Sequence, residues 1–238
     1  MHLARGRPEA APGSRRRRPS RTTVLSVALA VMLLGVAAWI AYGTTLLGVR
    51  EIAVSGSQIA GPDAVRAAAA VAAGTPLARV DTYEVADRVR TLPSVADVEV
   101  SRSWPHTLVI EVTERTAVAV VAGPDGFAVL SADGVVFNRV TAPPAGTVVL
   151  RLDSPGPGDP STVAALRVVA ALTPPLRAAL RELVAESPAR LVLNLADGRV
   201  IRWGDAERSD IKATVATALL DRPGRTIDVT VPDVATIS

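Results

Sequence analysis

The sequence predicts an α+β protein: a single transmembrane helix, then a β-α-α-β-β module, and then a mixed β-rich domain with flanking helices. Three observations predict it. A long run has no charge, alternating apolar and polar residues mark strands after it, and stretches with a helical period lie between these strands. We expect a basic cytoplasmic tail at 1–21, the transmembrane helix at 22–48, a first exported domain at 49–115 and a second at 116–238.

The basic charge of this chain is concentrated in its first residues. The sequence has 26 Lys and Arg against 23 Asp and Glu, but seven of the arginines and only one acid, Glu9, fall in 1–21. The rest of the chain is therefore mildly acidic, which argues against a nucleic-acid-binding body. The chain has no cysteine, which excludes a disulfide framework and a thiolate metal site.

The first expected element is a membrane anchor. Residues 24–47 carry no charge, and such a helix at about 1.5 Å per residue spans the hydrocarbon core of roughly 30 Å. Trp39 and Tyr42 lie near its far end, where amphipathic rings favour the membrane interface. The arginines precede the run, so the positive-inside rule predicts a single-pass type II protein with a cytoplasmic N-terminus and extracytoplasmic C-terminal domains. A cleaved signal peptide is the alternative, but its apolar region is normally shorter.

The module that follows begins with a strand and two helices. The strand is expected at 49–55. The first helix begins at Pro62 and stops before Gly74, since proline is favoured at the first helical position and glycine just past the last. The second begins at Asp81 in a capping pattern and ends before Pro93, which excludes the residue ahead of it from the helical region.

Two strands close the module and meet at a Trp104-Pro105 corner. In the first, Val98 and Val100 alternate with acids, and in the second, apolar residues recur at every other position over 108–112. A period of two is typical of half-buried strands. We expect Trp104 to anchor the hairpin over a small core, because the domain has few other aromatic residues. An exposed contact site is the alternative.

Glu114 and Arg115 end the last of these strands. We expect an ordinary strand-end ion pair, which contributes about 0–1 kcal/mol. A role between the two domains stays open.

The second domain is expected to mix strands and helices. Asp133-Gly134 and Asp197-Gly198 each lie between two apolar runs, which is a strong hairpin signal. We expect strands at 117–122, 127–130, 135–137, 148–152, 191–195, 200–203 and 227–231, and helices at 163–172, along the stripe of Leu176, Leu180, Leu183 and Val184, and along that of Ile211, Val215 and Leu219.

The first exported domain also combines particular residues in a particular order: Val54-x-Gly56, Gly74, Leu92-Pro93, Val95, Val98, Val100, Arg102, Trp104-Pro105, Leu108, Ile110, Val112 and Glu114-Arg115. This set resembles the POTRA module of the bacterial FtsQ/DivIB cell-division proteins. The run IDVTVPD at 227–233 and the order of tail, membrane helix and two domains are similar to that family too. One departure is Ala117, where the family often has a proline.

The resemblance implies a non-catalytic bitopic membrane scaffold, enriched at the division septum, that recruits or regulates other divisome proteins. The partners implied are small coiled-coil membrane proteins of the FtsB/DivIC and FtsL type, with no cofactor, nucleic acid or small-molecule substrate. A membrane-anchored exported enzyme of the cell wall is the alternative.

No catalytic or metal site is expected. His2 and His106 are the two histidines, and neither has an evident second ligand. The candidate partner-binding site is instead the last strand, where a free edge could accept a strand from another protein. The alternative is a strand that is paired on both sides within its own sheet. The candidate residues are Ile227, Asp228, Val229, Thr230 and Val231.

Overall fold

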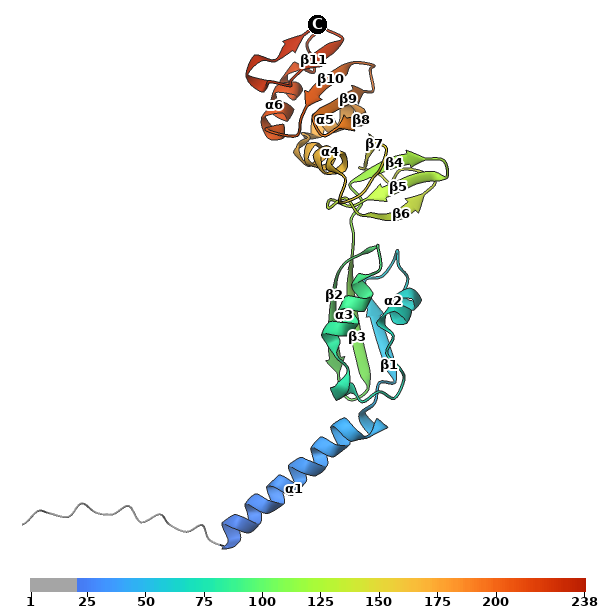
Figure 1. Cartoon of the computed structure of the whole chain (residues 1–238), viewed down its shortest axis with the longest axis vertical. Coiled ribbons are helices and arrows are strands. Elements are labelled where there is room, and N and C mark those ends of the chain that lie inside the picture. The colour runs from blue at the N-terminus through green and yellow to red at the C-terminus, as the bar shows by residue number, and fades with distance from the viewer. Residues whose placement is uncertain (1–20) are drawn as a thin grey trace, which may run out of the picture.

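The computed structural model describes residues 21–238, so His2 and nearly all of the expected cytoplasmic tail lie outside the described residues. Figure 1 shows a helix, a small first unit and a larger second unit following one another along the long axis, with the C-terminus at the far end. The mixed helix-and-strand fold expected from the sequence is confirmed.

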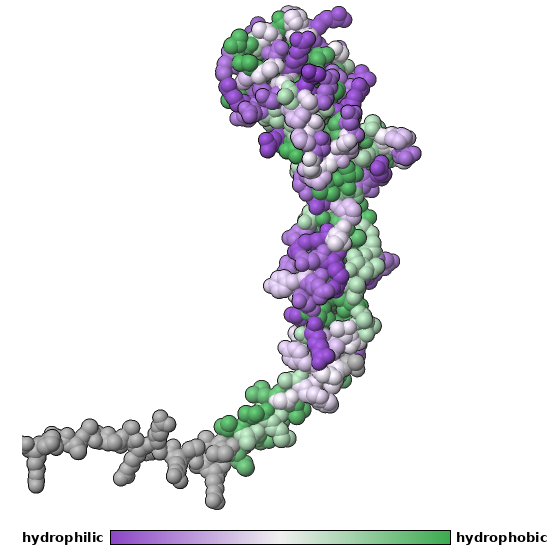
Figure 2. All heavy atoms as spheres, viewed as in Figure 1, coloured by the Kyte–Doolittle hydropathy of each residue, from purple (hydrophilic) through white to green (hydrophobic). Residues whose placement is uncertain are grey.

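Helix α1 (Arg21–Gly43) is followed by a short 3-10 helix, η1 (Thr45–Leu47). Many large apolar side chains of α1 are exposed, among them those of Leu25 and Leu34. The surface of α1 is the green region at the lower end of Figure 2. Among the residues that the structure describes, no helix is both long and apolar enough to cross a membrane. The transmembrane helix expected at 22–48 is therefore not confirmed.

The first unit has the expected order of strand, helix, helix, strand and strand. Its three-stranded sheet has the order β1-β3-β2, with β1 parallel to β3 and β2 antiparallel to it. Aliphatic residues of the sheet and of both long helices form one core. The elements are β1 (Glu51–Ser55), α2 (Pro62–Ala69), the 3-10 helix η2 (Leu77–Arg79), α3 (Thr82–Arg90), β2 (Val95–Ser103) and β3 (Thr107–Glu114).

Helix α2 ends earlier than expected. It stops at Ala69 because Ala70 takes the left-handed conformation, with φ 49°. Gly74 and Thr75, which follow this early end, pair with the segment after α1. Gly74 N donates to Val49 O at 2.8 Å, and Val49 N donates to Thr75 O at 2.9 Å. Helix α3 begins as expected, because the Asp81 carboxylate accepts hydrogen bonds from two N–H groups of its first turn.

Trp104 does not anchor the core, so this expectation is wrong. Its side chain is 53% exposed, while Leu108 and Ile110 on the next strand are fully buried. The core is filled by aliphatic side chains of the sheet and helices. Trp104 lies in the turn after β2, beyond the last paired residues, and therefore points away from that core.

The second unit is built on a nine-stranded sheet with the order β12-β11-β10-β9-β8-β7-β4-β5-β6. Both Asp-Gly hairpins form as expected. Its strands are β4 (Ala119–Gly123), β5 (Gly126–Leu130), β6 (Val136–Val140), β7 (Val148–Arg151), β8 (Leu180–Ser187), β9 (Arg190–Leu195), β10 (Val200–Gly204), β11 (Thr226–Asp228) and β12 (Thr236–Ile237). Its helices are α4 (Pro160–Ala171), α5 (Pro174–Ala179), α6 (Ser209–Leu219) and the 3-10 helix η3 (Pro232–Val234).

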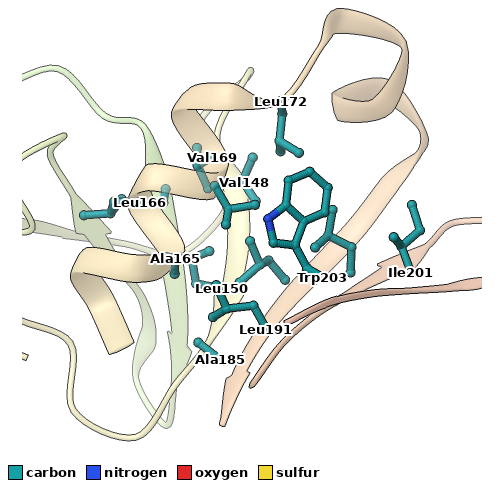
Figure 3. Packing of buried hydrophobic residues seen from close by; sticks show 14 of the residues in the cluster. Val148, Leu150, Ala165, Leu166, Val169, Leu172, Ala185, Leu191, Ile201 and Trp203 are labelled. Carbon is teal, nitrogen blue, oxygen red and sulfur yellow. The ribbon is translucent and has the colours of Figure 1, made fainter. Parts of the chain in front are cut away.

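The main core of the second unit lies between the sheet and its helices. Figure 3 shows the Trp203 ring among Leu150 and Leu191 of the strands, with Leu172 and Val169 above it at the helix. Trp203 is fully buried. Helix α4 therefore packs against β8 in the middle of the sheet.

The expected helix along Leu176, Leu180, Leu183 and Val184 is wrong beyond residue 179. Helix α5 ends at Ala179, and Leu180–Ser187 is strand β8. Leu183 and Ala185 alternate with more exposed neighbours, which is a strand pattern. Strand β8 pairs with β7 on one side and β9 on the other, in the middle of the sheet, so long-range pairing overrides the local helical spacing.

Glu114 and Arg115 do not pair with each other. The Glu114 carboxylate accepts hydrogen bonds from Ile59 N at 2.7 Å and Ala60 N at 2.8 Å, which holds the loop before α2. Arg115 donates from Nε to Pro93 O at 3.0 Å and forms an ion pair with Asp133 of the second unit. The pKa of Asp133 is lowered by the Ser131 hydroxyl and by Arg115. Arg115 therefore links the two units, which is the role that the sequence left open.

Replacing Arg115 with Ala removes this link between the units. We expect a broader distribution of distances between spin labels at Glu99→Cys and Asp221→Cys, measured by pulsed electron paramagnetic resonance; the chain has no cysteine that would interfere. Arg190→Ala is the matched control, because it removes an exposed ion pair within the second unit. An unchanged distribution in the Arg115 variant would contradict the assigned role.

Candidate partner-binding surface

The candidate strand is shorter than the sequence predicts, and it is not a sheet edge. Strand β11 ends at Asp228, whose carboxylate accepts a hydrogen bond from Thr230 N at 3.0 Å and so turns the chain. It pairs in parallel with β10 and antiparallel with β12, so it has a neighbour on each side. Of the five candidates, Ile227 and Val229 are buried in the core and Val231 is exposed. Of the two alternatives that the sequence left open for this strand, the structure shows the internally paired one.

The edge of the sheet at this end is β12. Thr226 N donates to Ser238 O at 2.9 Å, and Ser238 N donates to Thr226 O at 3.0 Å, which makes a closely bonded antiparallel pair. The next pair, Ile227 and Ile237, is then a pair without mutual hydrogen bonds. The N–H and C=O groups of Ile237 therefore face away from β11, where an added strand could bond to them.

A glycine makes this return of the chain possible. Gly224 has a φ of 145°, and a Cβ at this position would lie 2.1 Å from the Ile237 side chain. Any larger residue would push β12 away from β11. Arg225 N donates to Ser238 O at 2.8 Å, which holds the two segments together.

An ion pair between Arg208 and Asp233 holds the segment that leads into β12. The two guanidinium nitrogens lie 2.7 and 2.9 Å from the two carboxylate oxygens, which is a bidentate arrangement. Arg208 precedes α6 and Asp233 lies in η3, two elements that also pack on one another. The Arg208 guanidinium lowers the pKa of Asp233 through its hydrogen bonds and its charge. We call this ion pair the clasp.

Lys212 fixes the neighbouring corner between β10 and α6. It is the single lysine of the chain and is only 2% exposed. Its ammonium donates to Trp203 O at 3.1 Å, to Asp205 O at 3.0 Å and to the Asp205 carboxylate at 2.8 Å. These contacts satisfy a charge that would otherwise be costly to bury, and the Lys212 hydrogen bond lowers the pKa of Asp205.

The stripe expected on α6 lies only partly against the core. Val215 and Leu219 are partly buried against it, whereas Ile211 is 41% exposed, and Lys212, Ala213 and Ala216 are buried. Lys212 was not among the residues predicted from the sequence to be important. A signal was available, since a single lysine in a chain that otherwise uses arginine marks a place where a compact ammonium is needed.

Among residues 21–238, no group of three or more His, Asp or Glu side chains could hold a metal ion. His106 has a buried Nδ1 without a hydrogen-bond partner, and it lies in the turn beside Pro105. The C-terminal end of the sheet is thus a surface with an open backbone edge at β12.

Two family descriptions match the two units in order. Residues 47–115 match the POTRA domain of FtsQ type, and residues 119–233 match the C-terminal part of the cell division protein FtsQ/DivIB. The cell division protein FtsQ of Mycolicibacterium smegmatis is 43% identical over 90% of this chain and 62% of its own length. That of Mycobacterium tuberculosis is 40% identical over 91% of this chain and 68% of its own length.

The chain belongs to the FtsQ/DivIB family. It spans less than two thirds of the M. smegmatis relative. It is also similar to the FtsQ of Streptomyces collinus, at 38% identity over 89% of this chain and 86% of that protein. A solved extracytoplasmic domain of DivIB from Geobacillus stearothermophilus covers 46% of this chain at 20% identity, with a TM-score of 0.35.

In this FtsQ/DivIB chain, the IDVTVPD run at 227–233 contributes to the edge rather than forming it. Its first three residues belong to or follow β11, and its last, Asp233, is the acid of the clasp. The run therefore holds β12 in place, through the pairing of β11 with β12 and through the clasp. Val231 and Val234 are the exposed apolar side chains next to that edge.

The clasp should make β12 sensitive to acid. Because the native pKa of Asp233 is below its unfolded value of about 4, the clasp stabilises β12 above that pH and is lost as the pH falls through the native pKa. We expect the amide signals of Ile237 and Ser238 to change over this acid range in nuclear magnetic resonance spectra.

In Asp233→Asn the Ile237 signal should already take its altered position at neutral pH and should lose this titration. Asp63→Asn is the control, since it removes an exposed ion pair on α2. Identical titration curves for Ile237 in the wild type and Asp233→Asn would contradict the role of the clasp.

Proposed function

We propose that this chain is a non-catalytic bitopic membrane scaffold of the cell-division septum. In this role its two units recruit or regulate other divisome proteins. The observation that carries the proposal is the match of both units, in order, to the FtsQ/DivIB family over residues 47–233. The relatives that match over most of this chain are named as cell division proteins.

The proposal places α1 in the membrane and both units outside it. In support, residues 22–47 contain no charged residue. The apolar side chains of α1, such as Leu25, Leu33 and Leu34, are exposed, and lipid would cover them. The arginines within 1–21 would hold the N-terminus in the cytoplasm, which gives the type II orientation.

The proposed partners are small coiled-coil membrane proteins of the FtsB/DivIC and FtsL type, bound at the β12 edge. A strand of the partner would bond to the outward N–H and C=O groups of Ile237, in β-strand addition. The exposed side chains of Val231 and Val234 would contact apolar residues of that strand. The buried candidates, Ile227 and Val229, would hold the edge in place without touching the partner.

The alternative of an exported cell-wall enzyme would require a cleft with grouped catalytic side chains. Within 21–238, the most buried charged side chain, Lys212, is used in the fold by Trp203 and Asp205. We therefore propose the scaffold and not the enzyme.

A fluorescent fusion of the full chain tests the proposed function in dividing cells. We expect the fusion to gather at mid-cell, and we expect depletion of the protein to block septation and produce long undivided cells. A fusion of α1 with the fluorescent protein alone is the control for membrane insertion without the units. Even peripheral fluorescence of the full chain, with normal division on depletion, would contradict the proposal.

A further inference from the structure

The exposed Trp and Tyr residues of this chain gather where α1 meets the first unit. Trp39 and Tyr42 on α1 are 67% and 54% exposed, and Tyr83 and Trp104 in the first unit are 84% and 53% exposed. By contrast, Trp203 in the second unit is fully buried. Large aromatic side chains normally bury much of their surface, so their exposure at one end of the unit indicates a contact with another surface.

Tyr42 and Trp104 line the same open groove, of about 510 Å³. They reach it from elements far apart in the sequence: Tyr42 from the end of α1, and Trp104 from the turn between β2 and β3. Figure 2 shows a pale zone at this level, between the green surface of α1 and the purple surface above it. The groove is completed by residues of η2, α3 and β2: Ala78, Thr82, Val100, Ser101 and Arg102.

The segment after α1 is joined to the first unit by backbone hydrogen bonds. Val49 exchanges hydrogen bonds with Gly74 and Thr75, and Gly48 bridges to Pro76. A Cβ at Gly48 would lie 2.6 Å from Gly74 O, so glycine is needed for this close approach. The end of α1 is therefore held against the first unit and does not hang from a free linker.

Trp104 is held at the same end by its neighbours. Arg102 donates from Nε to Leu77 O at 3.0 Å and from Nη2 to Val80 O at 2.7 Å, which joins β2 to η2. Arg50 N donates to His106 O at 2.9 Å, which joins the start of β1 to the turn that follows Trp104. The turn that carries Trp104 is thus bonded to η2 through Arg102 and to the start of β1 through His106.

The charge at this end is suited to an anionic surface. Arg50 and Arg79 are exposed, and neither guanidinium has a hydrogen bond or ion pair within the described part of the chain. Glu51 and Asp81 are the nearby acids along the chain. The Asp81 carboxylate already accepts bonds from Tyr83 N and Glu84 N. Two arginines are therefore left available for external phosphate groups.

We propose that Tyr42, Arg50, Arg79 and Trp104 form a membrane-facing rim that docks on the interfacial region of the bilayer, with anionic lipid head groups on its arginines. Trp and Tyr favour this region because their rings are apolar and their N–H or O–H groups need polar partners. Arginine is drawn to it by anionic lipid. The inference rests on the proposed membrane position of α1. Its consequence is that the two units stand at a set angle to the membrane.

Tryptophan fluorescence of the full chain in lipid nanodiscs tests the rim. The discs contain phosphatidylcholine and phosphatidylglycerol, with or without bromine on the acyl carbons nearest the head group. In Trp39→Phe, only Trp104 and the buried Trp203 emit. We expect brominated lipid to lower the emission of this variant, and we expect that loss to vanish in Trp39→Phe/Trp104→Phe, whose Trp203 also reports that the second unit is folded.

The Trp104→Phe variant tests the anchor independently of the rim, because its exposed fluorescent tryptophan is Trp39 on α1. Quenching of Trp39 without quenching of Trp104 overturns the rim and leaves the anchor standing. Absence of quenching at both positions overturns the anchor, and the rim that rests on it falls with it. Quenching at both positions supports the rim.

The arginines are tested by Arg50→Gln/Arg79→Gln in the Trp39→Phe background. We expect the equilibrium constant for docking of the rim on the bilayer to fall by about fivefold for each arginine removed, and we expect this loss to depend on phosphatidylglycerol. Arg181→Gln/Arg190→Gln, in the second unit, is the matched control. Equal quenching of Trp104 in both double variants, with and without phosphatidylglycerol, would overturn the role of the arginines.

Discussion

The ion pair between Arg115 and Asp133 is the contact on which the arrangement of the two units depends. The chain passes from β3 to β4 through a few residues, and within them Arg115 is bonded in both directions. Its backbone N–H donates to Ser94 O at 2.8 Å and its guanidinium to Pro93 O, while the same side chain reaches the turn after β5.

This restraint matters because the two ends of the molecule have different tasks in the proposed function. At one end, α1 and the membrane-facing rim would set the position of the first unit at the bilayer. At the other, the sheet of the second unit ends at β12, near the C-terminus in Figure 1. The clasp between Arg208 and Asp233 and the buried Lys212 hold that sheet end in shape. In the proposed function, an edge held in this way would accept a strand without first becoming ordered.

Local signals made much of the fold predictable. Asp81 caps α3, and the two Asp-Gly turns form their hairpins, because each depends on a few neighbouring residues. Strand β8 was missed because the spacing of Leu180, Leu183 and Val184 also fits a helix, and only pairing with β7 and β9 decides between them.

The candidate site was harder to predict, for a physical reason of the same kind. The edge strand β12 has two residues and so carries no alternating pattern of its own. Its existence depends on the tight approach at Gly224 and on an ion pair between residues 25 positions apart. The run at 227–231 has the stronger pattern because Ile227 and Val229 are buried in the core, and burial is what an apolar alternation indicates.

Site-specific photo-crosslinking in dividing cells tests the central claim, that the β12 end of the sheet captures the partner. A photoreactive amino acid replaces Val234, which is exposed beside β12, or Arg139 on β6, the strand at the opposite end of the sheet. We expect a crosslink to a small coiled-coil membrane division protein from position 234 and none from 139. A crosslink to that protein from 139 alone would contradict it.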